Sequence, residues 1–316
     1  MAKAIRDVYG EALVKHGAEN ENIVVLDADV SSSTKSGLFG KAYPERFYNC
    51  GISEYAMTGM AAGMAVNGKI PFVNTFAVFL TTIGALSARA FLSYGQMNVK
   101  YMGAYGGLSD SYDGASHQSL EDIAAMRALP GMTVMVASDE LITDWMVKTA
   151  IEIDGPMYIR LSRDACTICH AEDQKYEIGK GVVCREGSDV TIIACGVMVS
   201  QSMKAAELLA EKGIHAKVVD MFTIKPIDRE LILASAKETG AIVTAEEHSV
   251  IGGLGGAVAE VLAQDSTGVP VEMIGTQDCH GESGAYAALL EKYGLDAASI
   301  AAGCEKAIAR KQGNEE

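Results

Sequence analysis

Short apolar runs separated by helical stretches recur along the chain, and this alternation is the feature that most restricts its fold. Residues 23–26 and 134–136 are wholly apolar, while residues 4–18 and 53–67 have helical character. Apolar runs without a polar residue at every second position predict strands that are buried on both faces. Such strands occur in parallel sheets that are covered by helices on each side. The sequence therefore predicts an α/β protein with mainly parallel sheets.

A polar stretch at residues 164–188 interrupts this alternation and divides the chain. We therefore expect two doubly wound α/β domains, at residues 1–165 and 186–316, joined by a linker at residues 166–185. The length of 316 residues is sufficient for two domains of ordinary size. Ligands of doubly wound folds bind at the carboxyl ends of the strands, and the polar loops at such ends collect in the first domain. These loops are residues 27–36, 50–54, 74–79, 105–117 and 160–164.

The second domain carries no comparable set of polar loops, and we expect it to be mainly structural. Its glycine run, Gly252-Gly253-Leu254-Gly255-Gly256, lacks the G-x-G-x-x-G spacing of a dinucleotide-binding loop. A tight turn from a strand into a helix is therefore predicted at this run.

The charge of the chain disfavours some classes of partner. The chain has 41 acidic and 26 basic residues, a net charge of −15 at pH 7, which disfavours nucleic acids and anionic membranes. No apolar run is long enough to span a bilayer. The seven cysteines have no disulfide-like spacing, which favours a reducing cytoplasm. The pair Cys166 and Cys169, beside His170, is a lone C-x-x-C, so no metal or redox site is predicted there.

The most informative single residue is Glu54, near the start of the predicted helix at residues 53–67. Ser53 is a suitable N-cap, and an acid in the first turn suits the positive end of the helix dipole. The rest of this helix is rich in methionine, alanine and glycine and has almost no polar side chains. Glu54 is therefore predicted to lie at the mouth of a buried site, where its carboxylate can share a proton with a bound base.

The polar loops of the first domain resemble those of the transketolase family in their order and spacing. The resemblance runs from Arg6 to the end of the chain and is sharpest between residues 46 and 163. It implies a thiamine pyrimidine-binding domain followed by a transketolase C-terminal domain. The motifs that carry it are Gly51-Ile52-Ser53-Glu54-Tyr55-Ala56-Met57, Thr75-Phe76-x-x-Phe79, Asp113-Gly114-Ala115-Ser116-His117-Gln118 and Arg160-Leu161-Ser162-Arg163.

The resemblance implies that the protein depends on thiamine diphosphate. Glu54 would hydrogen-bond the N1′ nitrogen of the aminopyrimidine ring and so favour the tautomer that accepts a proton from the thiazolium ring. Phe76 and Phe79 would pack against the pyrimidine in a dry pocket. Thr82 stands where family members often have a further aromatic residue, so we expect less complete stacking around this ring.

Two further groups of residues match family positions that bind the sugar. Asp113 and His117 match positions that contact the substrate's hydroxyl and carbonyl oxygens, and a histidine can donate or accept a proton near neutral pH. Arg6, Ser33 and Arg163 match the positions that bind a terminal phosphate. The resemblance therefore implies a transketolase that moves a two-carbon ketol unit from a ketose, such as a sugar phosphate, to an aldose.

One departure from the family concerns the terminal phosphate. Tyr105 stands where many transketolases have a histidine that contacts this phosphate. The run Leu108-Ser109-Asp110-Ser111-Tyr112 also differs from the commoner one. The sequence therefore leaves open a sulfonate or another terminal group in place of a phosphate.

A complete transketolase also needs a domain that binds the diphosphate and Mg²⁺ through a Gly-Asp-Gly…Asn signature, and this sequence lacks it. We therefore expect a separate N-terminal subunit that supplies this domain. Mg²⁺ is expected to be bound mainly by that subunit, and no residue of this chain is predicted to be a metal ligand. The active site would lie between the subunits. Gly59 and Gly63 would allow close helix approach at a dimer centre, and an α2β2 assembly is expected.

Three alternatives stay open. The β subunit of a 2-oxo acid dehydrogenase has the same pair of domains and the same glutamate, but typically lacks the Phe76 and His117 motifs together. A deoxyxylulose phosphate synthase fragment usually has an Asp-Arg pair where this chain has Ala104 and Tyr105. A non-catalytic scaffold or regulator descended from such a subunit is disfavoured by the retained Glu54, His117 and Arg163.

Overall fold

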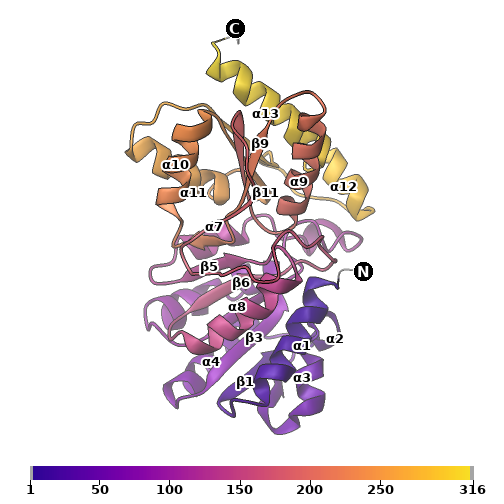
Figure 1. The fold of residues 1–316 in the computed structure, drawn as a ribbon. Helices are drawn as coiled ribbons and strands as arrows, with labels where there is room; N and C mark the ends of the chain where they lie inside the picture. The colour runs from indigo at the N-terminus through magenta and orange to yellow at the C-terminus, as the bar shows by residue number, and fades with distance from the viewer. Residues whose placement is uncertain (1–2, 314–316) are drawn as a thin grey trace.

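The computed structural model describes residues 3–313, which form two α/β domains placed one above the other (Figure 1). The first domain, indigo to pink, contains a seven-stranded sheet, and the second, coral to yellow, contains a five-stranded sheet. The prediction of two doubly wound domains with mainly parallel sheets is confirmed. Helix α1 (Ile5–Gly17) begins near the boundary between the domains, whereas α13 (Ala297–Lys311) ends at the far end of the second domain.

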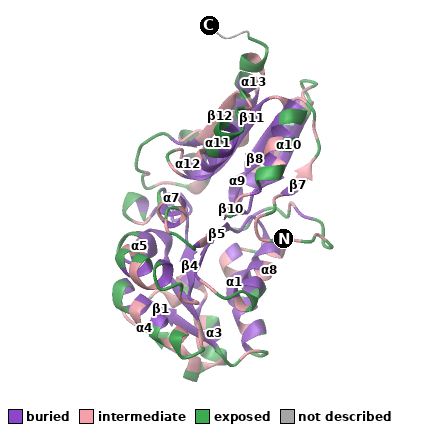
Figure 2. Ribbon diagram, turned by 90° about the vertical axis from the view of Figure 1, so that its left-hand side faces the viewer, coloured by how far each residue is buried: buried purple, intermediate pink, exposed green. Residues whose placement is uncertain are grey.

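The first sheet has the order β10-β5-β6-β4-β3-β1-β2, and all its neighbouring strands are parallel except β10 and β5. Strands β1 and β4 are buried at every residue, as expected for a sheet covered on both faces, and the strands are purple in Figure 2. The strands are β1 (Ile23–Asp27), β2 (Phe47–Asn49), β3 (Ile70–Phe76), β4 (Lys100–Ala104), β5 (Thr133–Val136), β6 (Met157–Arg160) and β10 (Thr223–Lys225).

Helices cover both faces of this sheet, and the helical stretch that follows β3 is broken. Residues 77–93 divide among α5, α6 and a π-helical turn. The hydroxyls of Thr81 and Thr82 donate to the carbonyls of Ala77 and Val78, and Gly84 follows, a combination that weakens a helix. The helices are α1 (Ile5–Gly17), α2 (Ser31–Thr34), α3 (Gly37–Ala42), α4 (Glu54–Val66), α5 (Ala77–Thr82), α6 (Ala85–Ser87), the π turn (Ala88–Ser93), α7 (Asp122–Arg127) and α8 (Glu140–Glu152), with short 3-10 turns at Pro44–Arg46 and Gly114–Ser116.

The second sheet has the order β12-β11-β8-β9-β7, and only β7 is antiparallel to its neighbour. Strand β7 lies at residues 182–185, within the stretch predicted to be linker. The strands are β7 (Val182–Arg185), β8 (Val190–Ala194), β9 (Ala216–Asp220), β11 (Ile242–Ser249) and β12 (Val271–Thr276). The helices are α9 (Val197–Ala210), α10 (Arg229–Thr239), α11 (Leu254–Gln264), α12 (Tyr286–Lys292) and α13 (Ala297–Lys311).

The glycine run at residues 252–256 forms the predicted tight turn into a helix. The carboxylate of Glu246 accepts hydrogen bonds from the backbone N–H groups of Leu254 and Gly255, at 2.7 and 2.8 Å, at the start of α11. A Cβ on Gly253 would lie only 2.0 Å from a carboxylate oxygen of Glu246, so this turn requires a glycine. The carboxylate occupies the place where a dinucleotide-binding loop would hold a phosphate.

A buried polar network joins the two domains. Arg160, at the end of β6, forms an ion pair with Asp122 at 2.8 Å and donates to the backbone carbonyl of Glu247 at 2.8 Å. The carboxylate of Glu247 in turn accepts from the backbone N–H of Leu108 at 2.8 Å. Glu247 belongs to the second domain and Leu108 to the long polar loop of the first, so the second domain supports that loop.

A second buried cluster holds the connection between the domains. The imidazole of His170 lies 3.1 Å from a carboxylate oxygen of Asp139 and 3.1 Å from one of Asp220. Asp139 begins α8 in the first domain, and Asp220 ends β9 in the second. Burial disfavours the charged imidazolium, but the two carboxylates outweigh this effect and raise the pKa of His170 far above its usual value.

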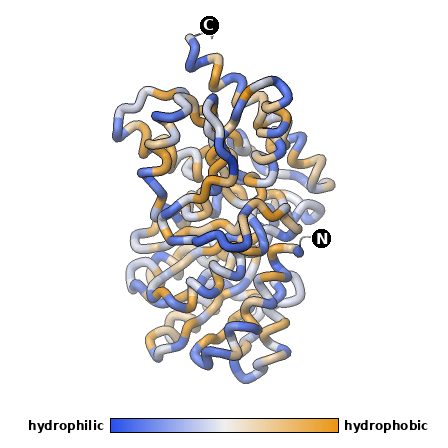
Figure 3. Tube along the Cα trace, viewed as in Figure 1, coloured by the Kyte–Doolittle hydropathy of each residue, from blue (hydrophilic) through white to orange (hydrophobic). Residues whose placement is uncertain are grey.

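All seven cysteines are free thiols. Among residues 3–313, no group of three or more His, Cys, Asp or Glu side chains is arranged to hold a metal ion. Hydrophobic and hydrophilic residues are interspersed along the chain (Figure 3). In the part of the chain that the structure describes, no helix is long and apolar enough to cross a membrane.

Candidate active site

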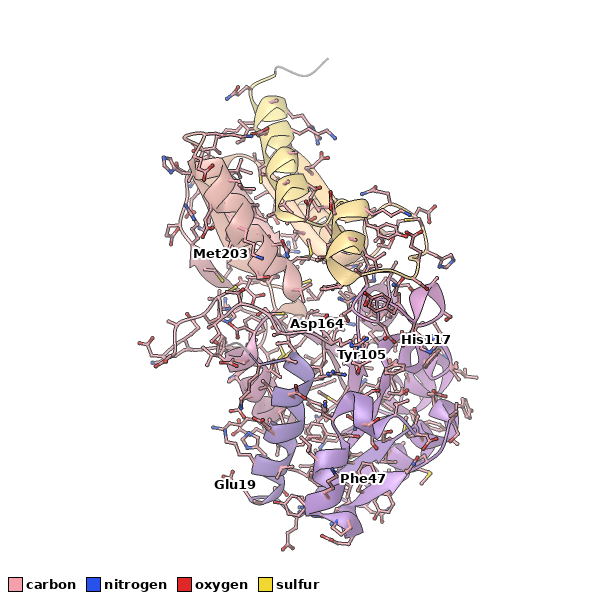
Figure 4. All side chains as sticks on the ribbon, turned by 90° about the vertical axis from the view of Figure 1, so that its right-hand side faces the viewer. Glu19, Phe47, Tyr105, His117, Asp164 and Met203 are labelled. Atoms are coloured by element: carbon pink, nitrogen blue, oxygen red, sulfur yellow. The ribbon has the colours of Figure 1, made fainter. Side chains whose placement is uncertain are left out.

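Four of the five predicted loops meet at the carboxyl ends of β1, β3, β4 and β6, on the side of the first domain that faces the second. Tyr105 and His117 both lie near the level at which the two domains meet (Figure 4). Parallel strands bring their carboxyl ends to one edge of a sheet, and the loops that follow them therefore converge. The site is built from the first residues of α1, the loop after β1, and the loops after β3, β4 and β6.

Tyr105 is the centre of this cluster. It follows β4 with φ +58°, a left-handed conformation that is costly for a bulky side chain and occurs most often at functional sites. Its hydroxyl accepts a hydrogen bond from the guanidinium of Arg6 and donates to the backbone carbonyl of Ser33 at 3.3 Å. The guanidinium groups of Arg6 and Arg163 each lie 5.4 Å from the centre of its ring. The three predicted anion-binding residues are thus brought together around Tyr105.

A buried aspartate positions the loop that carries Ser33. Asp27, at the end of β1, accepts hydrogen bonds from the backbone N–H of Val30 and from the hydroxyls of Thr34 and Ser36, at 2.7 to 2.9 Å. Burial raises the pKa of Asp27, and these three donors oppose that rise. Asp27 therefore fixes the short helix α2, and with it Ser33, against the sheet.

An aromatic cluster adjoins Tyr105. The ring of Phe76 stacks on Tyr105 with 4.8 Å between ring centres, and it lies 6.0 Å from the ring of Phe79. His117 meets Phe76 and Phe79 edge-on, at 5.9 and 5.2 Å. The structure therefore places the predicted ring-binding phenylalanines and the predicted proton-transfer histidine side by side. Thr82 is exposed and is not part of this cluster.

The loop after β4 places two aspartates near the arginines. The backbone of Asp113 donates to the carbonyl of Asp110 at 3.2 Å, and the side chain of Asp113 is exposed. Asp110 is fully buried, and its carboxylate lies 3.6 Å from a guanidinium nitrogen of Arg163. Burial, and then the neighbouring carboxyl of Asp113, raise the pKa of Asp110 to about 7, against the lowering effect of Arg163 and Arg6.

Glu54 begins α4 and is only 3% exposed. Ser53 does not cap the helix as predicted, because its hydroxyl donates to the carbonyl of Cys50 at 2.9 Å. Within the described residues, no hydrogen bond or ion pair engages the carboxylate of Glu54, and none joins it to the cluster around Tyr105. A buried carboxylate without a partner fits the N1′ nitrogen of an aminopyrimidine, which would supply the missing donor.

Two family models match the chain, the transketolase pyrimidine-binding domain over residues 1–167 and the transketolase C-terminal domain over residues 179–300. A Methanocaldococcus jannaschii protein described as a transketolase C-terminal section is 45% identical over 95% of this chain and 94% of its own length. A 6-deoxy-6-sulfo-D-fructose transketolase subunit of Clostridium sp. is 39% identical over 97% of this chain and 95% of its own length. A solved split-gene transketolase, an inactive beta4 tetramer, is 49% identical with a TM-score of 0.90 and covers 98% of this chain and 100% of its own.

The fold and the site together define the pyrimidine-binding half of a thiamine diphosphate enzyme. The chain belongs to the transketolase family, in which it corresponds to the C-terminal subunit of an enzyme whose two halves are separate chains. The family's reaction transfers a two-carbon ketol unit from a ketose to an aldose with thiamine diphosphate as cofactor. The alternatives of a 2-oxo acid dehydrogenase subunit and of a non-catalytic scaffold are not favoured.

Sequence reasoning did not single out Asp110 or the buried set of Arg160, Asp122 and Glu247. The only signal for Asp110 was that its segment departs from the family's usual run. The contact between Glu247 and the loop joins residues 139 positions apart, and no local pattern announces such a pairing. The charged groups that act on Asp110 all lie within the first domain, whereas the set of Arg160, Asp122 and Glu247 spans both domains.

Proposed function

We propose that this chain supplies the pyrimidine side of a composite active site and that a separate N-terminal subunit supplies the diphosphate side and the Mg²⁺ ligands. The observation that carries this proposal is the unpartnered carboxylate of Glu54, 3% exposed, in a domain that also gathers Phe76, Phe79 and His117. The chain's free cysteines suit a reducing cytoplasm as the place of this activity.

Each residue of the site has a distinct task in this proposal. Bound thiamine diphosphate supplies the carbon nucleophile and the electron sink of ketol transfer. Glu54 holds a proton at the N1′ nitrogen of the pyrimidine, and Phe76 and Phe79 flank that ring and exclude water. His117 moves a proton to or from a substrate oxygen, and Asp113 orients a substrate hydroxyl.

The terminal group of the sugar binds to Arg6, Ser33 and Arg163. The planar guanidinium groups suit a tetrahedral oxyanion, and the Ser33 hydroxyl adds one donor. The Nε atom of Arg6 is buried without a hydrogen-bond partner, so it is available to such a ligand. Because relatives include a 6-deoxy-6-sulfo-D-fructose transketolase subunit and an apulose-4-phosphate transketolase subunit, the terminal group is a phosphate or a sulfonate.

An exposed apolar surface around α4 supports the proposed partner. Monomeric proteins rarely expose several large apolar side chains on neighbouring elements, and such a surface marks an interface. The apolar side chains of this α4 surface are 46% to 90% exposed, and they are Ile52, Tyr55, Met60, Val66, Ile83, Leu86 and Tyr94. We propose that it joins this chain to the N-terminal subunit and to a second copy of itself in an α2β2 assembly.

Reconstitution tests the proposed function. The chain purified alone, with thiamine diphosphate and Mg²⁺, is expected to transfer no ketol unit from fructose 6-phosphate or 6-deoxy-6-sulfofructose to an aldose. The same chain purified with a subunit that carries the Gly-Asp-Gly…Asn signature is expected to turn over at least one of these ketoses. Full activity of the isolated chain contradicts the split site, and an inactive complex that contains both chains and cofactor contradicts the proposed function.

Replacing Gly63 with leucine is expected to weaken assembly without destabilising the chain. Gly63 is exposed on α4, and an added Cβ would meet no atom within 4 Å, so leucine fits the isolated subunit and favours the helix by roughly 0.5–1 kcal/mol. In the complex the same side chain would separate the packed helices, and the Kd between subunits should rise about tenfold or more. Sedimentation measures the Kd, and Ala302→Leu on the exposed face of α13 is the control. Equal effects of the two variants would contradict an interface at α4.

A further inference from the structure

Asp110 is a buried carboxylate that the proposed mechanism does not use. Its side chain is 0% exposed, and neither of its oxygens has a hydrogen-bond partner. The nearest cation is Arg163, whose Nη1 atom lies 3.6 Å away, beyond normal hydrogen-bond length. Buried polar atoms are almost always satisfied, and an unsatisfied carboxylate beside an anion-binding arginine therefore indicates a role toward a ligand.

The charged groups that act on Asp110 are the guanidinium groups of Arg163 and Arg6 and the carboxyl of Asp113. Arg6 lies on α1, Arg163 follows β6, Tyr105 follows β4, and Asp113 lies on the same loop as Asp110. The guanidinium groups of Arg6 and Arg163 come from different elements, and each lies 5.4 Å from the centre of the Tyr105 ring. With Asp110 ionised, the two guanidinium groups are balanced by the carboxylates of Asp110 and Asp113, so these four groups together carry no net charge.

We propose that Asp110 determines specificity at the site formed by Arg6, Ser33 and Arg163, where its charge favours a terminal sulfonate over a phosphate dianion. This inference rests on the proposed function, because it assigns the terminal group of the ketose that the same site binds. A sulfonate carries one negative charge at all physiological pH values. A phosphate monoester carries nearly two at pH 7, since its second pKa is about 6.

The discrimination has a direct electrostatic cause. The two guanidinium groups already face two carboxylates, and a dianion is repelled by the buried carboxylate of Asp110 twice as strongly as a monoanion at the same place. Like charges placed together are an effective means of rejecting a competing ligand. The Nε atom of Arg6, buried without a partner, and the hydroxyl of Ser33 remain as donors to the three sulfonate oxygens.

The pH dependence provides a second signature. The carboxyl of Asp110 has a pKa raised to about 7, so below this pH it is neutral and can donate to a ligand oxygen, and above it the group is charged. The KM for a phosphorylated ketose is therefore expected to rise as the pH increases above about 7. The KM for the matching sulfonate should change less, because the ligand has one charge fewer to be repelled.

The test compares two ketoses that differ only in the terminal group. In the complex of both subunits, kcat/KM is measured for 6-deoxy-6-sulfofructose and for fructose 6-phosphate. The wild-type complex is expected to prefer the sulfonate. In Asp110→Asn the ratio of the two kcat/KM values is expected to fall about tenfold or more, mainly through a lower KM for the phosphate.

Asp164→Asn is the matched control, because it removes an equal charge one residue from Arg163. The carboxylate of Asp164 acts on Cys166 and Tyr286 and is not among the largest influences on Asp110, so its loss should leave the ratio unchanged. If Asp110→Asn does not fold, inhibition of the wild-type complex by ethanesulfonate and by ethyl phosphate gives the same comparison. Stronger inhibition by the sulfonate supports the proposal, and stronger inhibition by the phosphate overturns it.

The outcomes separate this inference from the proposed function. A wild-type complex that turns over both ketoses but prefers the phosphate overturns the role of Asp110 and leaves the transketolase function intact. The same holds if Asp110→Asn folds and its ratio equals that of the wild type. A complete complex that turns over neither ketose contradicts the proposed function, and the specificity argument fails with it.

Discussion

Replacing Glu54 with glutamine is expected to lower the kcat of the assembled enzyme by between about 10² and 10⁴-fold. Glutamine keeps the size of the side chain but cannot hold a shared proton at the N1′ nitrogen of the pyrimidine. Because Glu54 is only 3% exposed and has no partner within the described part of the chain, no neighbouring group can take over this proton. Stopped-flow or coupled assays of ketol transfer in the complex of both subunits measure the effect.

The binding of thiamine diphosphate should be affected much less than kcat. The diphosphate end of the cofactor is held by the partner in this proposal, so calorimetry on the Glu54→Gln complex should still show saturable binding. Glu207→Gln, on the exposed face of α9, removes the same charge without touching the site and should leave both quantities unchanged. A Glu54→Gln complex with kcat within about threefold of the wild type would exclude Glu54 from proton transfer.

The first sheet and the site loops could be predicted because their signals are local. Continuous apolar runs such as residues 23–26 identify buried parallel strands, and the polar residues that follow those strands must meet at one sheet edge. Tyr105, Arg6, Ser33 and Arg163 lie together for this reason, although they are far apart in sequence.

Three features of the fold leave no apolar periodicity in the sequence. Strand β10 completes the first sheet although it belongs to the second half of the chain, where three residues alone give no strand signal. Strand β7 was hidden in a polar stretch because it is a half-exposed edge strand, paired on one side only. The break after α5 comes from threonine hydroxyls that compete for helix carbonyls, an effect that apolar periodicity does not register.

The largest effect on stability is expected from His170, which was set aside with the cysteine pair when only the sequence was considered. Replacing His170 with glutamine removes the cation between Asp139 and Asp220, both 0% exposed. Breaking a buried ion pair by removing one partner costs about 3–5 kcal/mol, because the remaining charge is left uncompensated. Urea denaturation followed by circular dichroism at pH 6 should show a loss of this size.

A suitable control is His215→Gln, since His215 is exposed and has no ion pair among the described residues. Its substitution should change the free energy of unfolding by less than about 0.5 kcal/mol, as for most surface changes. If both histidine variants lose similar stability, the buried cluster is not the cause. If His170→Gln is as stable as the wild type, the imidazole does not carry the charge that the geometry assigns to it.

The pH dependence of stability distinguishes a charged His170 from a neutral one. The pKa of His170 is raised in the folded state, so its contribution is fully present below the unfolded pKa of about 6.5 and is lost as the pH rises toward the folded value. Above pH 6.5 the folded protein retains a proton that the unfolded chain releases, and this group alone lowers the free energy of unfolding by up to about 1.4 kcal/mol per pH unit. His170→Gln lacks this dependence, so the difference between wild type and variant should narrow steadily from pH 6.5 to pH 9. A difference that stays constant over this range would mean that His170 is neutral in the folded protein.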